Sequence, residues 1–327
     1  MSISHCVCQG LTRLWTHDVQ QHTSGFYFVD DLSFSRLASL FCTLPTREVD
    51  AHDFRKTFNM NKNEFGEFEL PPLHTLAFFY PRLPESRLAI NQTEKVFCPP
   101  EPFTRRMWAG GSFRFNPERG LVVGSRATAF THVSSVEMKG FNPQGSDQGT
   151  KSNPLVFVQQ QIEYRQQCSP ILIEERRLHA YLPREVKANK RKIKEVQGLP
   201  KPDYTFTWTP TSTTLFRFSA LIFNAHLVHL DKCYSLVEEG YPERLVHGPL
   251  TALMLIEGLG YSGMQGGHRI HTFSYRAQNP SFVEKRQHIR GAIKDKKVIV
   301  WSEDDDGVVG MTGEVVYFYI ETRGVYY

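Results

Sequence analysis

The stretch His247-Gly-Pro-Leu-Thr-Ala-Leu-Met-Leu-Ile256 indicates a buried helix, because apolar residues occur on every face of the turns that follow Pro249. Pro249 occupies a position where a helix tolerates proline, in its first turn. A similar stretch occurs earlier in the chain, Leu70-Pro-Pro-Leu-His-Thr-Leu-Ala-Phe-Phe79. An internal repeat of this kind indicates a duplicated module. We therefore expect two related halves, each with one buried helix.

The segments around these two stretches are repeated as well. An amphipathic segment precedes each, at residues 31–41 and 213–223, with Asp31 and Thr213 as candidate N-caps. Runs of β-branched and aromatic residues follow each, separated by turn formers, and indicate antiparallel strands. These runs are residues 111–115, 121–131, 155–164 and 171–181 in the first half, and 268–275, 289–300 and 308–320 in the second. The expected fold class is α+β.

A length of 327 residues fits two modules of ordinary size. We place the first module at residues 1–184, a linker at 185–210 and the second module at 211–327. Lysine and arginine are frequent between residues 184 and 194, which is typical of a solvated connector. A basic edge that meets the phosphates of an acyl carrier is the alternative. Residues 141–153 indicate a long hairpin loop inside the first module.

Composition excludes several classes of protein. Hydrophobic residues make up 40% of the chain, enough for a packed core. A net charge of +4 from scattered residues does not indicate a nucleic-acid partner, and no run of apolar residues is long enough to span a membrane as a helix. The six cysteines fit neither a zinc site nor a disulfide framework. We expect free thiols and an intracellular protein, either cytoplasmic or mitochondrial.

Candidate catalytic residues cluster in Phe223-Asn-Ala-His-Leu-Val-His229, directly after the second amphipathic segment. Asn224, His226 and His229 place three polar groups in one short turn with apolar neighbours. Histidine titrates nearest neutrality, so such a turn suits general acid-base catalysis. Histidines satisfied by backbone carbonyls are the structural alternative. A metal site that adds Asp231 lacks a second set of ligands, so we expect no metal.

A second candidate feature lies about twenty residues further on, at Val246-His-Gly-Pro249. A glycine that opens a helix lets a ligand approach closely, and it leaves backbone N–H groups free at the positive end of the helix dipole. Gly248 is therefore a candidate donor to a developing oxyanion on a thioester carbonyl. A simple helix start would have the same sequence.

The sequences Phe216 to Asp231 and Gly240 to Leu250 resemble those of the MaoC-like double hotdog hydratases, and most closely the branch of mesaconyl-CoA hydratases and fungal hydroxyacyl-thioester dehydratases. The segment Arg105-Arg-Met-Trp-Ala-Gly-Gly111 also resembles that branch. The resemblance implies a double hotdog, in which two antiparallel sheets are each wrapped around a central helix and pair side by side. It also implies the addition or removal of water on a 2,3-enoyl or 3-hydroxyacyl thioester, with no cofactor.

The resemblance also assigns roles within the turn. The wider family has an Asp-x-Asn-Pro-x-His turn with a catalytic Asp and His, and matching positions place that Asp on Asn224, the Asn on His226 and the His on His229. An asparagine cannot transfer a proton as an aspartate does. His229 is therefore the expected base or acid, with His226 as its partner, Asn224 as a water holder and Gly248 as the oxyanion donor.

Further residues are expected to bind substrate, namely Ser219, Phe223, His247 and Arg276, with Lys232 as another candidate for carrier phosphates. The first half carries no comparable turn at residues 40–45, so we expect it to shape the acyl pocket without taking part in catalysis. The expected partner is an acyl-CoA or an acyl-carrier thioester, and the chain is expected to be a monomer or a homodimer.

Asn224 leaves other functions open. One is dehydration or cyclisation of a bulky, polyketide-like substrate. Another is a hotdog protein that binds acyl thioesters without altering them. A thioesterase is a further alternative on the same fold.

Overall fold

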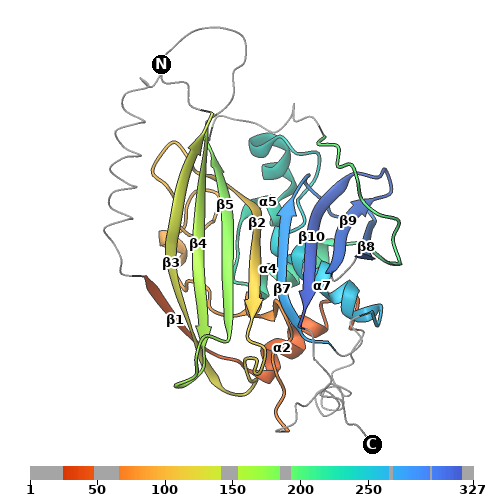
Figure 1. Ribbon diagram of the computed structural model, residues 1–327. Helices are drawn as coiled ribbons and strands as arrows, with labels where there is room; N and C mark the ends of the chain where they lie inside the picture. The colour runs from red at the N-terminus through yellow and green to blue at the C-terminus, as the bar shows by residue number, and fades with distance from the viewer. Residues whose placement is uncertain are drawn as a thin grey trace, which may run out of the picture.

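The computed structural model describes residues 25–47, 66–140, 154–184, 193–264, 268–294 and 297–318. Its centre is one antiparallel sheet with the strand order β1-β3-β4-β5-β2-β7-β10-β9-β8-β6 (Figure 1). The strands are β1 Phe26–Asp31, β2 Arg105–Phe115, β3 Arg126–Lys139, β4 Leu155–Arg165, β5 Ile173–Leu182, β6 Tyr204–Trp208, β7 Ile270–Ala277, β8 Gln287–Lys294, β9 Lys297–Asp304 and β10 Val309–Tyr317.

The two halves join at the pairing of β2 with β7, where Phe113 lies opposite Phe273. A glycine is needed at this junction, because a Cβ on Gly111 would lie 2.4 Å from the carbonyl oxygen of Arg176 and 2.8 Å from the Tyr275 hydroxyl. The strands on either side of the junction come from separate halves of the chain. This is the double hotdog arrangement that the sequence predicted, with the two sheets side by side.

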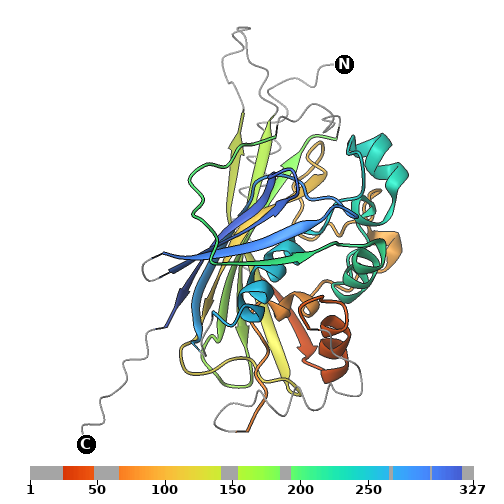
Figure 2. The same cartoon turned by 90° about the vertical axis from the view of Figure 1, so that its right-hand side faces the viewer.

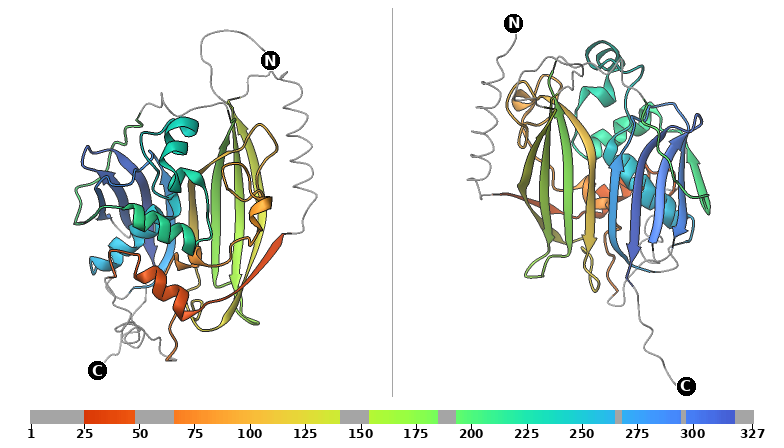
Figure 3. Two further views of the ribbon diagram at one scale, coloured as in Figure 1. Left: turned by 180° about the vertical axis from the view of Figure 1, so that it is seen from behind. Right: turned by 45° about the horizontal axis from the view of Figure 1, so that its top comes forward.

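The helices lie on one face of this sheet (Figures 2 and 3). They are α2 Phe34–Phe41, α4 Ser212–Leu221, α5 Leu227–Leu230, α6 Lys232–Tyr234 and α7 Gly248–Tyr261, with the 3-10 turns η1 His74–Ala77 and η2 Glu85–Arg87 and the π turn η3 Ser235–Glu239. The predicted helix at 247–256 is α7, and its residues 249–259 are all buried. Among the described residues, no helix is long and apolar enough to cross a membrane.

The prediction of a central helix at residues 70–79 of the first half is wrong. Residues 70–79 contain only the four-residue turn η1. Leu73 and Phe79 have φ angles of 66° and 59°, which a right-handed helix cannot accommodate. Pro81 and Pro84 follow at once, and a proline disfavours helical conformation in the residue before it. The inner face of the first sheet therefore has no long helix packed on it in this segment.

The amphipathic segments form helices, but with caps other than those predicted. Asp31 is the last residue of β1, and the Ser33 hydroxyl caps α2 by accepting from the Arg36 N–H. Thr211, not Thr213, caps α4 through a reciprocal capping box with Thr214. The predicted run 289–300 is divided between β8 and β9, and β1 was not predicted.

Strand β6 falls inside the predicted linker at 185–210 and pairs with β8 of the second half. We propose to count it with the second module. The boundaries at 184 and 211 otherwise stay predictions. The predicted hairpin loop at 141–153 and the basic residues 185–192 lie outside the described residues.

Candidate active site

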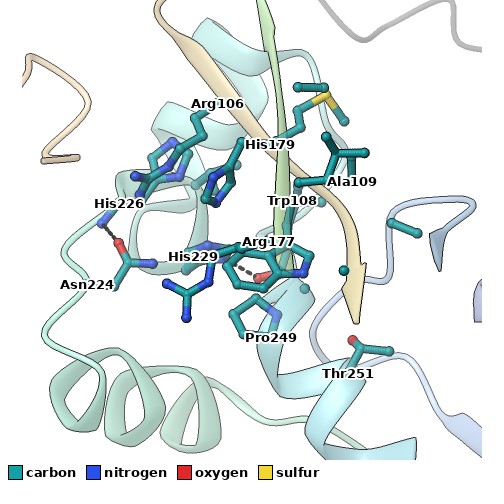
Figure 4. Close-up of a pocket in the computed structure, with 18 of the residues that line it drawn as sticks. Arg106, Trp108, Ala109, Arg177, His179, Asn224, His226, His229, Pro249 and Thr251 are labelled. Atoms are coloured by element: carbon teal, nitrogen blue, oxygen red, sulfur yellow. Dashed lines mark hydrogen bonds between the residues drawn. The ribbon is translucent and has the colours of Figure 1, made fainter. Parts of the chain in front are cut away.

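A cavity of about 1650 Å³ lies between the helices and the sheet, and both halves line it. The second half contributes the end of α4, the histidine turn and the start of α7. The first half contributes strands β2, β4 and β5 and the apolar segment 76–83. Figure 4 shows Asn224, His226 and His229 facing a wall that carries Arg106, Trp108, Arg177 and His179.

Backbone contacts fix the histidine turn where α4 ends. The Asn224 N–H donates to the Ser219 carbonyl (2.9 Å), and the Asn224 Oδ1 accepts the N–H of His226 (3.1 Å). The Leu227 N–H donates to the carbonyl of Asn91 from the first half (3.1 Å). Because Oδ1 is occupied, the amide NH2 of Asn224 is left as a donor for the cavity, consistent with the predicted water holder.

The tautomer of His229 follows from its hydrogen bond. Its Nδ1 lies 2.8 Å from the Leu245 carbonyl oxygen, which can only accept, so Nδ1 carries the proton and Nε2 carries the lone pair. Burial lowers the pKa of His229 to about 4, with the Leu245 hydrogen bond opposing this shift and the charge of Arg106 adding to it. His229 is therefore neutral near pH 7, with Nε2 ready to accept a proton.

His226 lines the cavity beside His229, with a distance of 5.5 Å between the ring centroids. Its Nε2 has no hydrogen-bond partner among the described residues. Burial, and then the charges that His229 and Arg106 would contribute, hold the pKa of His226 well below its usual value. A buried imidazole nitrogen without a partner is costly unless a ligand or water meets it.

His247 lies behind His229 rather than in the cavity wall. The two rings stack with centroids 3.7 Å apart, and His247 Nε2 lies 2.8 Å from the Ser219 hydroxyl. The His247 side chain is fully buried and does not line the cavity, whereas Ser219 does. The predicted contact of His247 with substrate is therefore corrected, since this packing gives it a positioning role.

Gly248 begins α7 and lies against Trp108 of the first half. A Cβ at this position would lie 2.7 Å from the Trp108 Cβ, so only glycine fits. The first N–H groups of a helix have no partner within it. The N–H of Gly248 is thus available at the positive end of α7, and Gly248 lines the cavity.

The other predicted substrate contacts lie further out. Phe223 has a φ of 51°, is exposed, and stacks on Tyr80 with centroids 5.4 Å apart. Arg276 is exposed on β7 and lines the cavity. Lys232 instead pairs with Glu243 (2.6 Å) and does not line the cavity. Among the residues that the structure describes, no group of three His, Cys, Asp or Glu side chains could hold a metal.

The sequence did not reveal the arginines of the first half. Arg105 pairs with Glu239, Arg106 with Glu94, and Arg177 with Glu175. All three arginines line the cavity. The resemblance of residues 105–111 to known hydratases was a signal for the first two, but nothing in the sequence pointed to Arg177.

The sequence of this chain matches those of known proteins. The model of the family hydroxyacyl-thioester dehydratase type 2 matches residues 74–283. The mesaconyl-C(4)-CoA hydratase of Chloroflexus aurantiacus is 33% identical over 250 residues, which are 75% of this chain and 83% of that protein. The mitochondrial hydroxyacyl-thioester dehydratase type 2 of Schizosaccharomyces pombe is 29% identical over 231 residues, 66% of this chain and 75% of the relative.

Solved structures show the same fold. A MaoC-like dehydratase from Phytophthora capsici superposes with a TM-score of 0.57 and 14% identity, covering 91% of this chain and 96% of that one. The peroxisomal multifunctional enzyme type 2 of Drosophila melanogaster gives a TM-score of 0.59 and 12% identity, covering 97% of this chain and 53% of that one.

The fold and the site define an enzyme of the hydratase and dehydratase class, built as a double hotdog. Within that class, the chain belongs to the hydroxyacyl-thioester dehydratase type 2 family.

Proposed function

We propose that this chain is a hydro-lyase that adds water to a 2,3-enoyl thioester or removes it from a 3-hydroxyacyl thioester. The observation that carries the proposal is the hydrogen bond of His229 Nδ1 to Leu245, which leaves Nε2 as a base in the cavity. The names of both curated relatives support the same reaction class.

In the hydration direction, His229 Nε2 takes a proton from a water whose oxygen forms a bond to C3 of the acyl group. The electrons of the C2–C3 double bond move toward the thioester oxygen, and the N–H of Gly248 stabilises the enolate that forms. The imidazolium of His229 then gives its proton to C2, which restores the neutral base. Asn224 and His226 hold the water in place. Dehydration follows the same steps in reverse.

A panel of thioesters tests this proposal. The purified chain is incubated with enoyl-CoA, mesaconyl-CoA and 3-hydroxyacyl-CoA substrates, and mass spectrometry follows the gain or loss of water. We expect His229→Ala to lower kcat by at least about 100-fold while the protein stays folded, since the loss of a general base costs that much. His288→Ala is the matched control, because His288 contacts Thr207 and Asp305 away from the cavity.

The outcomes separate the competing functions. An unchanged rate in His229→Ala would overturn the proposal. Release of free thiol would indicate a thioesterase, and binding without product at any pH would indicate an acyl-binding protein. Turnover limited to bulky polyketide-like substrates would indicate the specialised dehydratase or cyclase.

We also propose a CoA-linked or carrier-linked substrate and a cytoplasmic or mitochondrial location. The fission yeast relative is named as mitochondrial, and the four described cysteines are free thiols. The two sheets already pair within one chain, so a monomer is complete without a partner, and a homodimer is the other proposed state. Fractionation and light scattering test location and oligomeric state.

A further inference from the structure

Arg177, a half-buried arginine in the cavity wall, has donors that no described residue occupies. Arg105 and Arg106 both use terminal nitrogens to bind a carboxylate, that of Glu239 and Glu94 respectively. Arg177 uses only its Nε, which donates to Glu175 (2.7 Å). Its two terminal NH2 groups have no acceptor among the described residues, and they form the planar fork that arginine offers to carboxylate and carbonyl oxygens.

The surrounding residues hold this guanidinium in one position. Glu175 is fully buried and also accepts the Tyr164 hydroxyl (2.6 Å). The guanidinium carbon of Arg177 lies 5.1 Å from the centre of the Trp108 ring, and Figure 4 shows both side chains among those that line the pocket. Burial alone would lower the pKa of Arg177, but the charge of Glu175 raises it overall. The fork is therefore fixed and charged.

A second polar group lies beside it. Gln160 on β4 is directly opposite Arg177 in the register with β5, and both line the cavity. Gln160 is only 4% exposed, and its amide, which forms no hydrogen bond with a described residue, lines the cavity. An amide in such a wall can form a hydrogen bond with a polar group of a ligand in the cavity. Arg177 and Gln160 are thus adjacent groups that can both donate hydrogen bonds to an oxygen atom of a ligand.

The position of this pair relative to the reacting carbons follows from Trp108. One edge of the indole packs on Gly248, and its ring lies against Arg177. With the thioester carbonyl at Gly248, as the proposed function requires, an acyl chain that runs past Trp108 reaches the wall that holds Arg177 and Gln160. Around them the wall is apolar, with Phe79 and Ile162. An acyl chain that reaches this region would contact apolar side chains and the polar groups of Arg177 and Gln160.

We propose that Arg177 and Gln160 bind an oxygen acceptor on the acyl group beyond C3, so that the substrate is an oxygen-bearing acyl thioester and not a plain alkyl one. The inference rests on the proposed hydro-lyase function and specifies its substrate class. Both carboxylate and carbonyl oxygens suit the fork. A substrate carboxylate would be a second negative charge beside Arg177, whose positive charge Glu175 already balances. A carbonyl group is neutral and adds no charge to this site.

Three enoyl-CoA substrates of equal chain length test the inference: one unsubstituted, one with a terminal carboxylate and one with a terminal ketone. We expect kcat/KM to be at least about tenfold higher for an oxygenated substrate, because a site built for a hydrogen bond discriminates against the analogue that lacks it. The carboxylate and ketone arms identify which oxygen the site binds.

Variants assign the preference to these residues. Arg177→Met and Gln160→Leu should each lower the ratio of kcat/KM between oxygenated and alkyl substrates by about tenfold or more. Because Arg177→Met leaves Glu175 unpaired, Arg177→Met with Glu175→Gln provides a version without the buried charge. Gln161→Leu is the matched control on β4, since Gln161 does not line the cavity, and its ratio should equal that of the wild type.

Failure of the inference differs from failure of the proposed function. If no thioester gains or loses water, the proposed function is wrong. If the alkyl substrate is turned over as well as the oxygenated ones, or if both Gln160→Leu and the Arg177 variants leave the ratio unchanged, the substrate class proposed here is wrong and the hydro-lyase stands.

Discussion

At the scale of single residues, the site depends on imidazoles that stay neutral. Burial is the largest cause that lowers the pKa of His226, His229 and His247, and His229 also lowers the pKa of the other two rings. The Leu245 carbonyl determines the tautomer of His229, because it accepts a hydrogen bond from Nδ1 and leaves Nε2 unprotonated. The Ser219–His247 pair then fixes the plane on which His229 stacks.

The pKa of His229 near 4 predicts the pH dependence of turnover. Protonated Nε2 cannot accept a proton, so activity is lost as pH falls through about 4 and should be flat from about pH 5 to 7. A solvated histidine base would instead lose activity below about 6.5. A pH profile of kcat/KM distinguishes the two, and an acidic limb centred near 6.5 would contradict the neutral, buried base.

At the scale of elements, the sequence predicted α7 because a fully apolar helix has an unmistakable pattern. It did not predict that residues 70–79 form no long helix. Leu73 and Phe79 have left-handed backbone conformations there, which depend on tertiary packing and not on the local sequence pattern. β6 was missed because Tyr204–Trp208 is a short strand that follows a basic run and two prolines, Pro200 and Pro202.

The same contrast applies to the candidate site. Asn224, His226 and His229 are contiguous in sequence, so their clustering could be predicted. Arg177 and Gln160 are brought together only by the register of β4 with β5, and this register arises from the sheet as a whole. A single sequence carries no signal for such a pair.

The junction of β2 with β7 gives a prediction at this scale. Gly111→Val should destabilise the protein by about 3 kcal/mol or more, because its side chain would overlap the Arg176 carbonyl and the Tyr275 hydroxyl. Ser112→Ala, the next residue on β2, is the control and should change stability by less than about 1 kcal/mol. Urea unfolding measures both. A Gly111→Val protein as stable as the wild type would show that the two strands do not pair as closely as described.

At the scale of the whole molecule, an ion pair between Arg47 and the buried Glu257 of α7 joins the two halves. Glu257 of α7 accepts two hydrogen bonds from Arg47 (2.6 and 2.7 Å) and one from Thr46 (2.9 Å). His74 of η1 directs its Nε2 toward the same carboxylate at 3.7 Å. Burial lowers the pKa of His74 to about 4, so the carboxylate depends on Arg47 for its counter-charge near pH 7.

This network predicts that the two halves lose stability together when it is broken. Glu257→Gln keeps the shape but leaves Arg47 without its counter-ion, and it should cost about 2 to 4 kcal/mol. Glu163→Gln removes the partner of Arg165 at the surface and should cost less than about 1 kcal/mol. Because the pair ties α7 to the first half, urea unfolding reported by Trp108 and by Trp301, each retained as the single tryptophan, should shift by the same amount. A shift confined to Trp301 would mean that Glu257 stabilises its own half alone.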